Sequence, residues 1–222
     1  MEFESLRERL LELDAQAWAT IKVAAEAGDS EAQFLLGYRL YDTRLEHDDC
    51  ERWLREAATQ GHPEALYHLS QTTFRPELMT ATCPATEEGL KLLTKAAELG
   101  SVNAQRDLAV CFIDGEPPFE KDWSKARFWY YQAAGQGHQE SQATVGSIIV
   151  RGEGGPANHE EGLALLERAA NGPETYEAVT AAGELALYYS GAFGVPVNAQ
   201  KTAEWEKTSE RLLAAEQRRL LP

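Results

Sequence analysis

Small and apolar residues recur along the chain at intervals that predict amphipathic helices. In three stretches, apolar or small residues follow a small starting residue after four, five and eight positions. Residues at these offsets share one face of an α-helix. We call the starting residue position zero of a first helix. The three sets are Ala32, Leu36, Gly37 and Leu40; Ala104, Leu108, Ala109 and Phe112; and Ser141, Val145, Gly146 and Ile149.

A short motif in front of these stretches repeats along the chain. It reads AAEAGDSEA, AATQGHPEA, AAELGSVNA and AAGQGHQES, with an altered fifth copy, AANGPETYEAVTA. The first alanines are Ala24, Ala57, Ala96, Ala133 and Ala169, so the steps are 33, 39, 37 and 36 residues. Periods of this length are typical of two-helix solenoid units.

A second helix is predicted before each alanine pair. A small residue lies seven positions before the first alanine, and bulky residues lie four and three positions before it. Interlocking helices require such a fixed register of small and bulky positions. The small residues are Cys50, Gly89, Ala126 and Gly162, and the bulky pairs are Trp53 and Leu54, Leu92 and Leu93, Trp129 and Tyr130, and Leu165 and Leu166.

The residues just before position zero predict where the first helices begin. Ser30, Pro63 and Ser101 stand where an N-cap or first-turn residue belongs. His62 and His138 each follow the glycine of the motif, and we assign them a role at the helix start as well.

These strings together resemble the Sel-1-like repeat, a relative of the tetratricopeptide unit. The resemblance rests on AA-x-x-G-H-x-E-A, an L-G-x-x-Y-like stretch, G-x-G-V-P and A-x-x-W-x-x-x-A-A, and it covers residues 17–209 approximately. It implies an all-α fold, a right-handed α/α superhelical solenoid of about five helix-pair repeats. We therefore expect a single domain over residues 1–222, with helical caps at 1–16 and 210–222.

Two copies depart from the pattern. The second has a long connector without a counterpart, residues 71–86, which is a natural place for binding specificity. The fifth separates Ala169 from Ala181 by 12 residues where the other copies show 8. We interpret these four extra residues as close to one added helical turn.

Charge narrows the classes of partner. The 222 residues include 21 Lys and Arg against 36 Asp and Glu, a net charge of −15. This balance disfavours nucleic acid and anionic membranes and favours a protein partner with basic groups. The acidic first thirty residues do not resemble a signal peptide, and no apolar stretch is long enough to span a bilayer. We therefore expect a cytoplasmic protein.

Motifs of established catalytic chemistry are missing from the sequence. It contains no GxSxG, SxxK, HExxH or P-loop string. Some relatives of the family are described as β-lactamase-like, but the missing SxxK argues against that activity here. The acidic run around His47 stands at a predicted helix start, and Cys50, Cys83 and Cys111 form no metal-ligand pattern. We predict no enzyme, no cofactor and no metal site.

A binding surface is the remaining candidate for function. In helix-pair solenoids the first helices usually line the concave side, and offsets two, three and six point away from the core stripe. Aromatic residues at these offsets favour recognition, although offset two also serves packing between repeats. The predicted partner-binding residues are Phe34, Tyr38, Tyr67, His68, Gln71 and Arg106, with Phe74 and Met79 of the long connector. Other residues at these offsets are Leu35, Asp107, Val110, Ala143, Thr144 and Ser147.

Three functional hypotheses follow. The first is a non-catalytic cytosolic adaptor or scaffold that binds proteins through the concave groove and the 71–86 connector. The second is an inhibitor or immunity-type protein that neutralises a cognate toxin or enzyme. A hydrolase of β-lactamase-like type is the least favoured. The sequence leaves the oligomeric state open.

Overall fold

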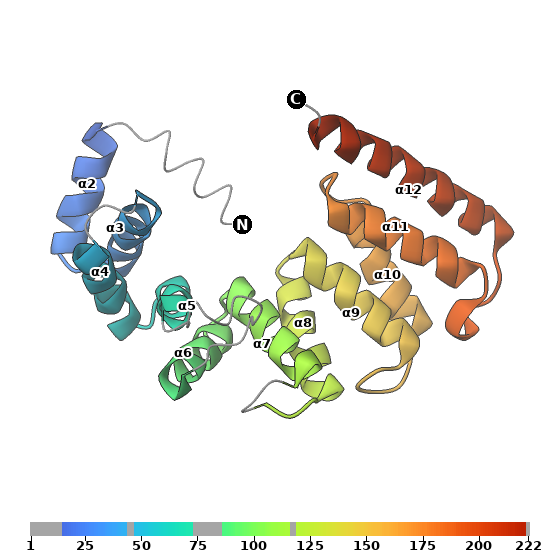
Figure 1. Ribbon diagram of the computed structural model, residues 1–222, viewed down its shortest axis with the longest axis horizontal. Helices are drawn as coiled ribbons and strands as arrows, with labels where there is room; N and C mark the ends of the chain where they lie inside the picture. The colour runs from blue at the N-terminus through green and yellow to red at the C-terminus, as the bar shows by residue number, and fades with distance from the viewer. Residues whose placement is uncertain (1–14, 44–46, 73–85, 116–118, 221–222) are drawn as a thin grey trace. The chain divides into compact units, whose positions relative to one another are not determined.

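The described part of the chain is built from α-helices and one short 3-10 helix. A computed structural model describes residues 15–43, 47–72, 86–115 and 119–220. These residues hold eleven α-helices and no strand, which confirms the all-α class (Figure 1). The helices are α2 (Ala15–Glu26), α3 (Ser30–Thr43), α4 (His47–Thr59), α5 (Pro63–Thr72), α6 (Glu87–Glu98), α7 (Val102–Asp114), α8 (Trp123–Gly135), α9 (Gln139–Arg151), α10 (His159–Ala170), α11 (Tyr176–Tyr189), the 3-10 helix η2 (Ala192–Gly194) and α12 (Ala199–Leu220).

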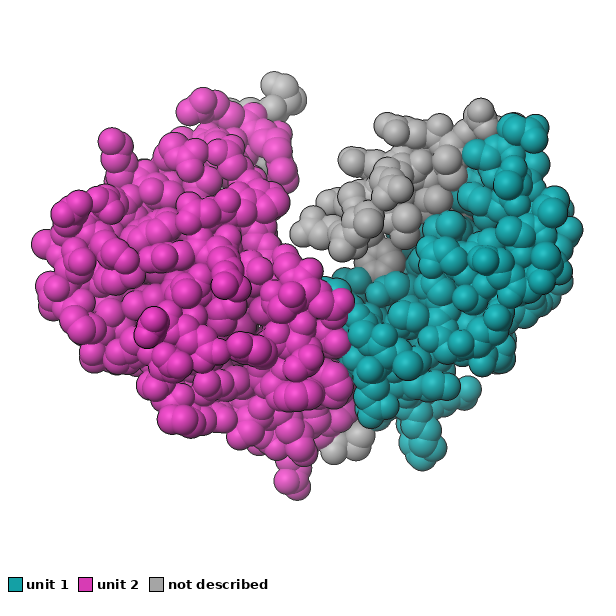
Figure 2. Space-filling view, turned by 180° about the vertical axis from the view of Figure 1, so that it is seen from behind, with its two compact units in different colours: residues 1–104 teal, residues 105–222 magenta. Residues whose placement is uncertain are grey.

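Two compact units divide the chain: unit 1, residues 1–104, and unit 2, residues 105–222 (Figure 2). In unit 1, each described helix from α2 to α6 packs against the next. In unit 2, the same holds from α8 to α12, and α9 also packs against α11. Helices that bury their faces against chain neighbours are what stacked helix-pair repeats require. The single-domain organisation stays a prediction.

Burial confirms the predicted register of the second helices. The residue three positions before the alanine pair is in the core of the four copies for which it was predicted, since Leu54, Leu93, Tyr130 and Leu166 are at most 4% exposed. The alanine pairs that begin at Ala57, Ala96, Ala133 and Ala169 are also buried. Ala24 is only half-buried, and among the described helices the main packing partner of α2 is α3. The position four before the pair varies: Trp53 and Leu165 are buried, whereas Leu92 and Trp129 are half-buried.

Side chains cap the first helices as the sequence indicates, with one shift. Ser101 accepts a hydrogen bond from the backbone N–H of Ala104, and His62 and His138 accept equivalent bonds in front of α5 and α9. These bonds satisfy N–H groups that have no partner within the helix. Ser30 is the first residue of α3, and Asp29 caps it instead.

The fifth copy corrects one prediction from the sequence. Thr175 caps α11 by accepting a bond from the N–H of Ala178, so position zero is Ala178 and not Ala181. Only one residue is therefore inserted relative to the other copies, and it lies in the turn at 171–175, not in an added helical turn. The predicted insertion was too long because the sequence offers two candidate alanines. Counted from Ala178, offset five is Gly183, which matches Gly37 and Gly146 of other copies.

Glycines bring α9 and α10 into backbone contact in unit 2. A Cβ atom built on Gly146 would lie 2.8 Å from the carbonyl oxygen of Gly162, and one built on Gly162 would lie 2.6 Å from that of Gly146. Both distances are too short for any side chain, so the two helices need glycine on both sides. The positions equivalent to Gly162 in unit 1 are Gly89 and Cys50. Cys50 is 2% exposed and fills the small-residue slot predicted for it.

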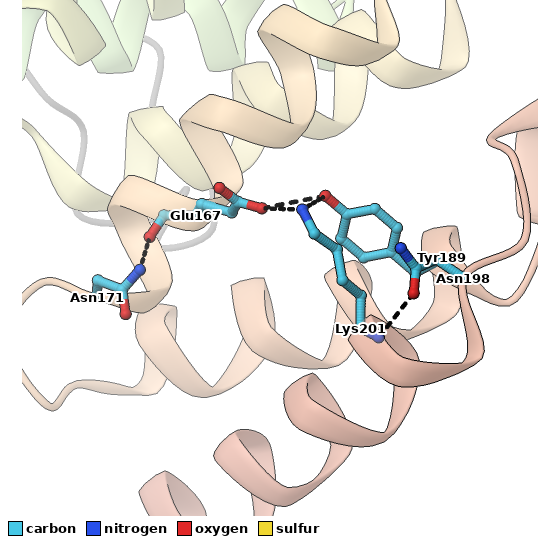
Figure 3. A network of polar contacts seen from close by, with 5 residues as sticks. All are labelled: Glu167, Asn171, Tyr189, Asn198 and Lys201. Carbon is cyan, nitrogen blue, oxygen red and sulfur yellow. Dashed lines mark hydrogen bonds and ion pairs between the residues drawn. The ribbon is translucent and has the colours of Figure 1, made fainter.

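A polar network holds the long helix α12 against its neighbours (Figure 3). Lys201 of α12 donates to the Tyr189 hydroxyl of α11 at 2.8 Å and to Glu167 of α10 at 3.3 Å. Tyr189 also donates to Glu167 at 3.0 Å, and Asn198 accepts from the backbone N–H of Lys201. Helix α12 continues unbroken past residue 210, where a separate cap was expected, and buries Leu212. Of the expected N-terminal cap, residues 1–14 lie outside the described residues.

Candidate protein-interaction site

The aromatic residues predicted to line a groove in unit 1 are largely packed inside it. Phe34 is 2% exposed and Tyr38 is 9% exposed. The Phe34 ring stacks on His62 with 4.6 Å between centroids, and Tyr38 meets His68 edge-on at 5.1 Å. Phe34 therefore packs between repeats, the alternative that the sequence left open for offset two. The expectation that Tyr38 points away from the core is wrong, because the ring of His68 lies against it.

The remaining predicted residues of α5 are half-buried. Tyr67, His68 and Gln71 keep part of their surface, and the rings of Tyr67 and His68 lie 5.6 Å apart. Burial lowers the pKa of His68 to about 4, with a smaller contribution from the charge of His62. The imidazole of His68 is therefore neutral at pH 7. The predicted contact residues Phe74 and Met79 lie outside the described residues.

Arg106, the predicted contact of unit 2, lies among acidic side chains. Its Nε lies 3.1 Å from Asp107 and 3.9 Å from Glu140 of α9. The Arg106 side chain is 26% exposed, whereas that of Asp107 is 5% exposed. Arg106 is placed to neutralise a buried carboxylate, and a role in partner binding stays a prediction.

Unit 2 has an open groove on the same offsets of its first helices, with a volume of about 210 Å³. Thr144 and Ser147 of α9 stand at offsets three and six, and Thr180 and Glu184 of α11 stand at offsets two and six from Ala178. We call this surface the first-helix groove. It is lined by Ile113, Trp123, Ala143, Thr144, Ser147, Ile148, Arg151, Glu153, Thr180 and Glu184.

The charges of the first-helix groove are only partly matched within the chain. Arg151 donates to Glu184 at 3.0 Å and to the hydroxyl of Tyr188 at 3.1 Å, and Ser147 donates to Glu184. Burial lowers the pKa of Arg151, but the bond to Tyr188 and the charges of Glu184 and Glu153 outweigh it and raise the pKa. By contrast, Oε2 of Glu153 is buried and accepts no hydrogen bond from any described residue. The groove therefore holds an unused acceptor.

A second hollow, which we call the α4–α6 groove, lies within unit 1 and has a volume of about 450 Å³. Its floor is apolar, because Ala58, Leu66 and Leu69 are buried there. Charged side chains of both signs surround this floor. The full lining is Glu51, Arg55, Ala58, Thr59, Leu66, Leu69, Glu88, Leu92 and Lys95. The sequence placed Ala143, Thr144 and Ser147 of the first-helix groove at outward offsets. It did not locate the α4–α6 groove, which depends on how far apart the helices of successive repeats stand.

In the part of the chain that the structure describes, side chains that could bind a metal ion or act as nucleophiles do not form a site. There, no three side chains among His, Cys, Asp and Glu converge in a way that could hold a metal ion. Cys50 and Cys111 are buried, and burial, aided by the charge of Glu51, raises the pKa of Cys50 to about 11. A thiol with a raised pKa is a poor nucleophile at pH 7. Cys83 and the side chain of His47 lie outside the described residues.

Helix pairs with this repeat register define an α-helical repeat protein. The Sel1 repeat model matches residues 30–62, 84–101, 102–138, 139–173 and 178–205. The chain therefore belongs to the Sel1 repeat family, which confirms the resemblance seen in the sequence. No helix formed by the described residues is both long enough and apolar enough to cross a membrane.

Relatives of known sequence are longer than this chain. The Sel1-repeat-containing protein YjcO of Escherichia coli is 29% identical over 158 residues, which are 71% of this chain and 65% of YjcO. An uncharacterized protein of Neisseria meningitidis is 27% identical over 158 residues and only 32% of it is covered. The chain thus spans between about a third and two thirds of the length of these relatives.

Solved structures share the fold. A Sel1 repeat protein from Oxalobacter formigenes is 27% identical, with a TM-score of 0.65 over 88% of this chain and 78% of that one. The protective antigen c5321 of uropathogenic Escherichia coli is 25% identical, with a TM-score of 0.68 over 87% of this chain and 40% of that one. The immunity protein PA5088 from Pseudomonas aeruginosa is 15% identical, with a TM-score of 0.51 over 95% of this chain and 81% of that one. At this identity the match supports a shared fold only.

Proposed function

We propose that this chain is a non-catalytic adaptor of the cytosol that binds a segment of another protein in the first-helix groove. Sel1 repeat proteins are typically protein-interaction modules, which supports the class of function. The first-helix groove is a suitable binding place for the partner, because it is open and is lined by residues at the outward offsets of two successive first helices. Peptide segments commonly bind along such faces of helical repeats.

The buried, unused oxygen of Glu153 is the observation that carries this proposal. An unsatisfied buried acceptor costs free energy, so a ligand that brings a donor gains more than it would on an open surface. Glu184 is already paired with Arg151, which leaves Glu153 as the acceptor for a partner's Lys, Arg or backbone N–H. The net charge of −15 favours a basic segment through long-range attraction.

Other predicted contacts extend the proposed surface. Tyr67, His68 and Gln71 keep exposed surface in unit 1, and Arg106 does so in unit 2. Phe74 and Met79 of the 71–86 connector would add apolar contacts, as the sequence predicts. Each of these contacts is part of the proposal and is tested by the same capture experiment, one alanine variant at a time.

The test is affinity capture from the native host with matched charge-reversal variants, read by quantitative mass spectrometry. Glu153→Lys should reduce the captured partner at least tenfold, because it places a cation where the partner's donor binds. Glu160→Lys is the control, since Glu160 is exposed in the first turn of α10 and outside the groove. Equal capture by wild type and Glu153→Lys would remove the groove from consideration.

The immunity-type hypothesis is a second candidate, favoured by the acidity of the chain. The immunity protein PA5088 shows that a related fold occurs in a protein with that description. Affinity separates the two candidates. An inhibitor should bind one partner with a nanomolar or lower Kd, whereas an adaptor should bind several partners more weakly.

A further inference from the structure

Phe193 has a backbone conformation that strongly favours glycine. It lies in the 3-10 helix η2 between α11 and α12, with a φ of 54° and a ψ of 27°. At every other positive φ among the described residues, the chain has a glycine. The left-handed region is unfavourable for a residue with a Cβ atom, and a bulky side chain is rare there. Phe193 is therefore strained at a place where glycine would fit freely.

Contacts within the chain account for only part of the Phe193 ring. The side chain is 57% exposed. Its ring meets the ring of Tyr188 edge-on, with 5.9 Å between the centroids, and the guanidinium carbon of Arg151 lies 5.7 Å from its centroid. The second distance is near the upper limit of about 6 Å for a cation–ring contact. These contacts hold the ring in place, but more than half of its surface stays in water, so burial within the chain does not explain the strain.

The ring lies beside the first-helix groove, because Arg151 belongs to both. Arg151 lines the groove and is held there by its bonds to Glu184 and to the hydroxyl of Tyr188. Its guanidinium group also lies over the ring of Phe193. Strained residues in folded proteins are concentrated at positions that contact ligands. The position of Phe193 next to a groove is in line with such a role.

We propose that Phe193 is a specificity-determining contact of the first-helix groove. Its exposed ring would bind a large apolar side chain of the partner segment, beside the basic or N–H donor that Glu153 accepts. This inference rests on the proposed function, but it concerns a different residue and a different part of the partner, so the two can fail separately.

The charges around Phe193 favour an apolar side chain over a charged one. A second cation on the ring is disfavoured, because Arg151 already lies over it. A carboxylate is disfavoured as well, because Glu184 and Glu153 both act on the charge of Arg151 and the whole chain has a net charge of −15. An apolar side chain gains free energy by removing the exposed ring from water. Large aromatic side chains are also frequent among the residues that dominate binding energy.

The first test selects random 12-residue peptides, displayed on phage, against the full chain. Wild type should enrich Lys or Arg at least threefold and should enrich Leu, Ile, Met or Phe at least threefold within three positions of it. Phe193→Gly should keep the basic preference and lose the apolar one, whereas Glu153→Lys should at least halve the basic preference. A wild-type selection that is basic but not apolar would overturn this inference and leave the proposed function standing. A selection without basic preference would overturn both.

The second test measures the Kd of the best selected peptide by fluorescence anisotropy. Phe193→Gly should weaken binding at least tenfold. The matched control is Phe128→Ala, since Phe128 of α8 is a phenylalanine of similar exposure, 53%, outside the groove lining. This control should change the Kd less than twofold. Undiminished binding by Phe193→Gly, or an equal loss in the control, would refute a specific role of Phe193.

The third test separates binding from stability with two variants at one position. Phe193→Gly and Phe193→Ala both remove the ring, but only alanine keeps a Cβ atom in the left-handed region. Phe193→Gly should therefore melt about 2–4 °C above Phe193→Ala, while their Kd values for the peptide agree within twofold. Equal melting temperatures would show that the position is not strained. A melting temperature of Phe193→Gly more than about 8 °C below wild type would assign the ring to the core. Either result would overturn the inference.

Discussion

The pair α4 and α6 of unit 1 and the pair α8 and α10 of unit 2 follow the same repeat register but present different surfaces. Buried positions agree, since Leu93 and Leu166 are both fully buried three residues before their alanines. Exposed positions differ, since Arg55 stands where unit 2 has Tyr131. In a stacked repeat, packing between neighbouring repeats fixes the buried positions, whereas the solvent-facing positions are free to differ from one repeat to the next.

The largest expected effect concerns the tryptophans four residues before the alanine pair. Trp53→Ala should lower the free energy of unfolding by about 3–5 kcal/mol, because Trp53 is 7% exposed. Trp129→Ala should cost only about half as much, roughly 2 kcal/mol, because Trp129 is half-buried. Urea unfolding, with amide hydrogen exchange to assign the loss to a unit, measures both. Equal costs would show that the two units pack this position alike.

The second effect is a pH dependence of the free energy of unfolding that arises from His68 in unit 1. Burial lowers the folded-state pKa of His68 to about 4, below the value of 6.5 for an unperturbed histidine. The unfolded chain therefore binds more protons between these values, and stability present above pH 6.5 is lost as the pH falls toward 4, by about 3 kcal/mol in total.

A matched variant isolates this contribution. Burial also raises the pKa of Glu64, an effect opposed by its bonds to Ser101 and Asn103, and a raised carboxyl pKa acts with the opposite sign. Wild type and His68→Leu both contain Glu64, so its contribution cancels when the two proteins are compared. For each protein, urea unfolding measures how much free energy of unfolding is lost between pH 6.5 and pH 4.5, and the difference between these two losses reports His68. The variant should lose about 2 kcal/mol less than wild type over this range. Parallel curves would contradict the buried, neutral His68.

The third effect tests the close backbone contact of unit 2. Gly→Ala inside a helix ordinarily stabilises by about 0.5–1 kcal/mol. Gly162→Ala should instead destabilise by about 1–3 kcal/mol, because its Cβ would lie 2.6 Å from the carbonyl oxygen of Gly146. Gly135→Ala, at a position with open space around the added atom, is the control and should be neutral or stabilising. Thermal unfolding of the two variants gives the sign directly.

The smallest effect concerns the exposed hydroxyl group of Tyr131 in α8, whose pKa is raised by the nearby carboxylate of Glu161. Tyr131→Phe removes this hydroxyl group but keeps the ring. Because Tyr131 is 45% exposed, the free energy of unfolding should fall by less than about 1 kcal/mol. Urea unfolding at low and high salt measures it. A loss of several kcal/mol would mean that the Tyr131 hydroxyl group contributes to the core of unit 2.

Most of the fold follows from the sequence because its signals are local. The alanine pairs, the small residue at Cys50 or Gly162 and the caps at His62 and Ser101 are fixed by neighbours within one or two helical turns, and burial confirms them. The fifth copy was misaligned because Ala178 and Ala181 both satisfy a rule for a small residue. Only the bond from the N–H of Ala178 to Thr175 distinguishes them.

The sequence by itself determined the helix pairs, their register, the family and the acidic character that favours a protein partner with basic groups. The tertiary structure alone decided which outward positions stay open. Phe34 and Tyr38 stand at offsets that were expected to face a groove, but rings of the next repeat bury them, whereas Glu153 keeps an acceptor without a partner among the described residues beside the first-helix groove. The physical reason is that exposure depends on side chains of a neighbouring repeat some thirty residues away, and a local pattern contains no information on how closely those side chains approach.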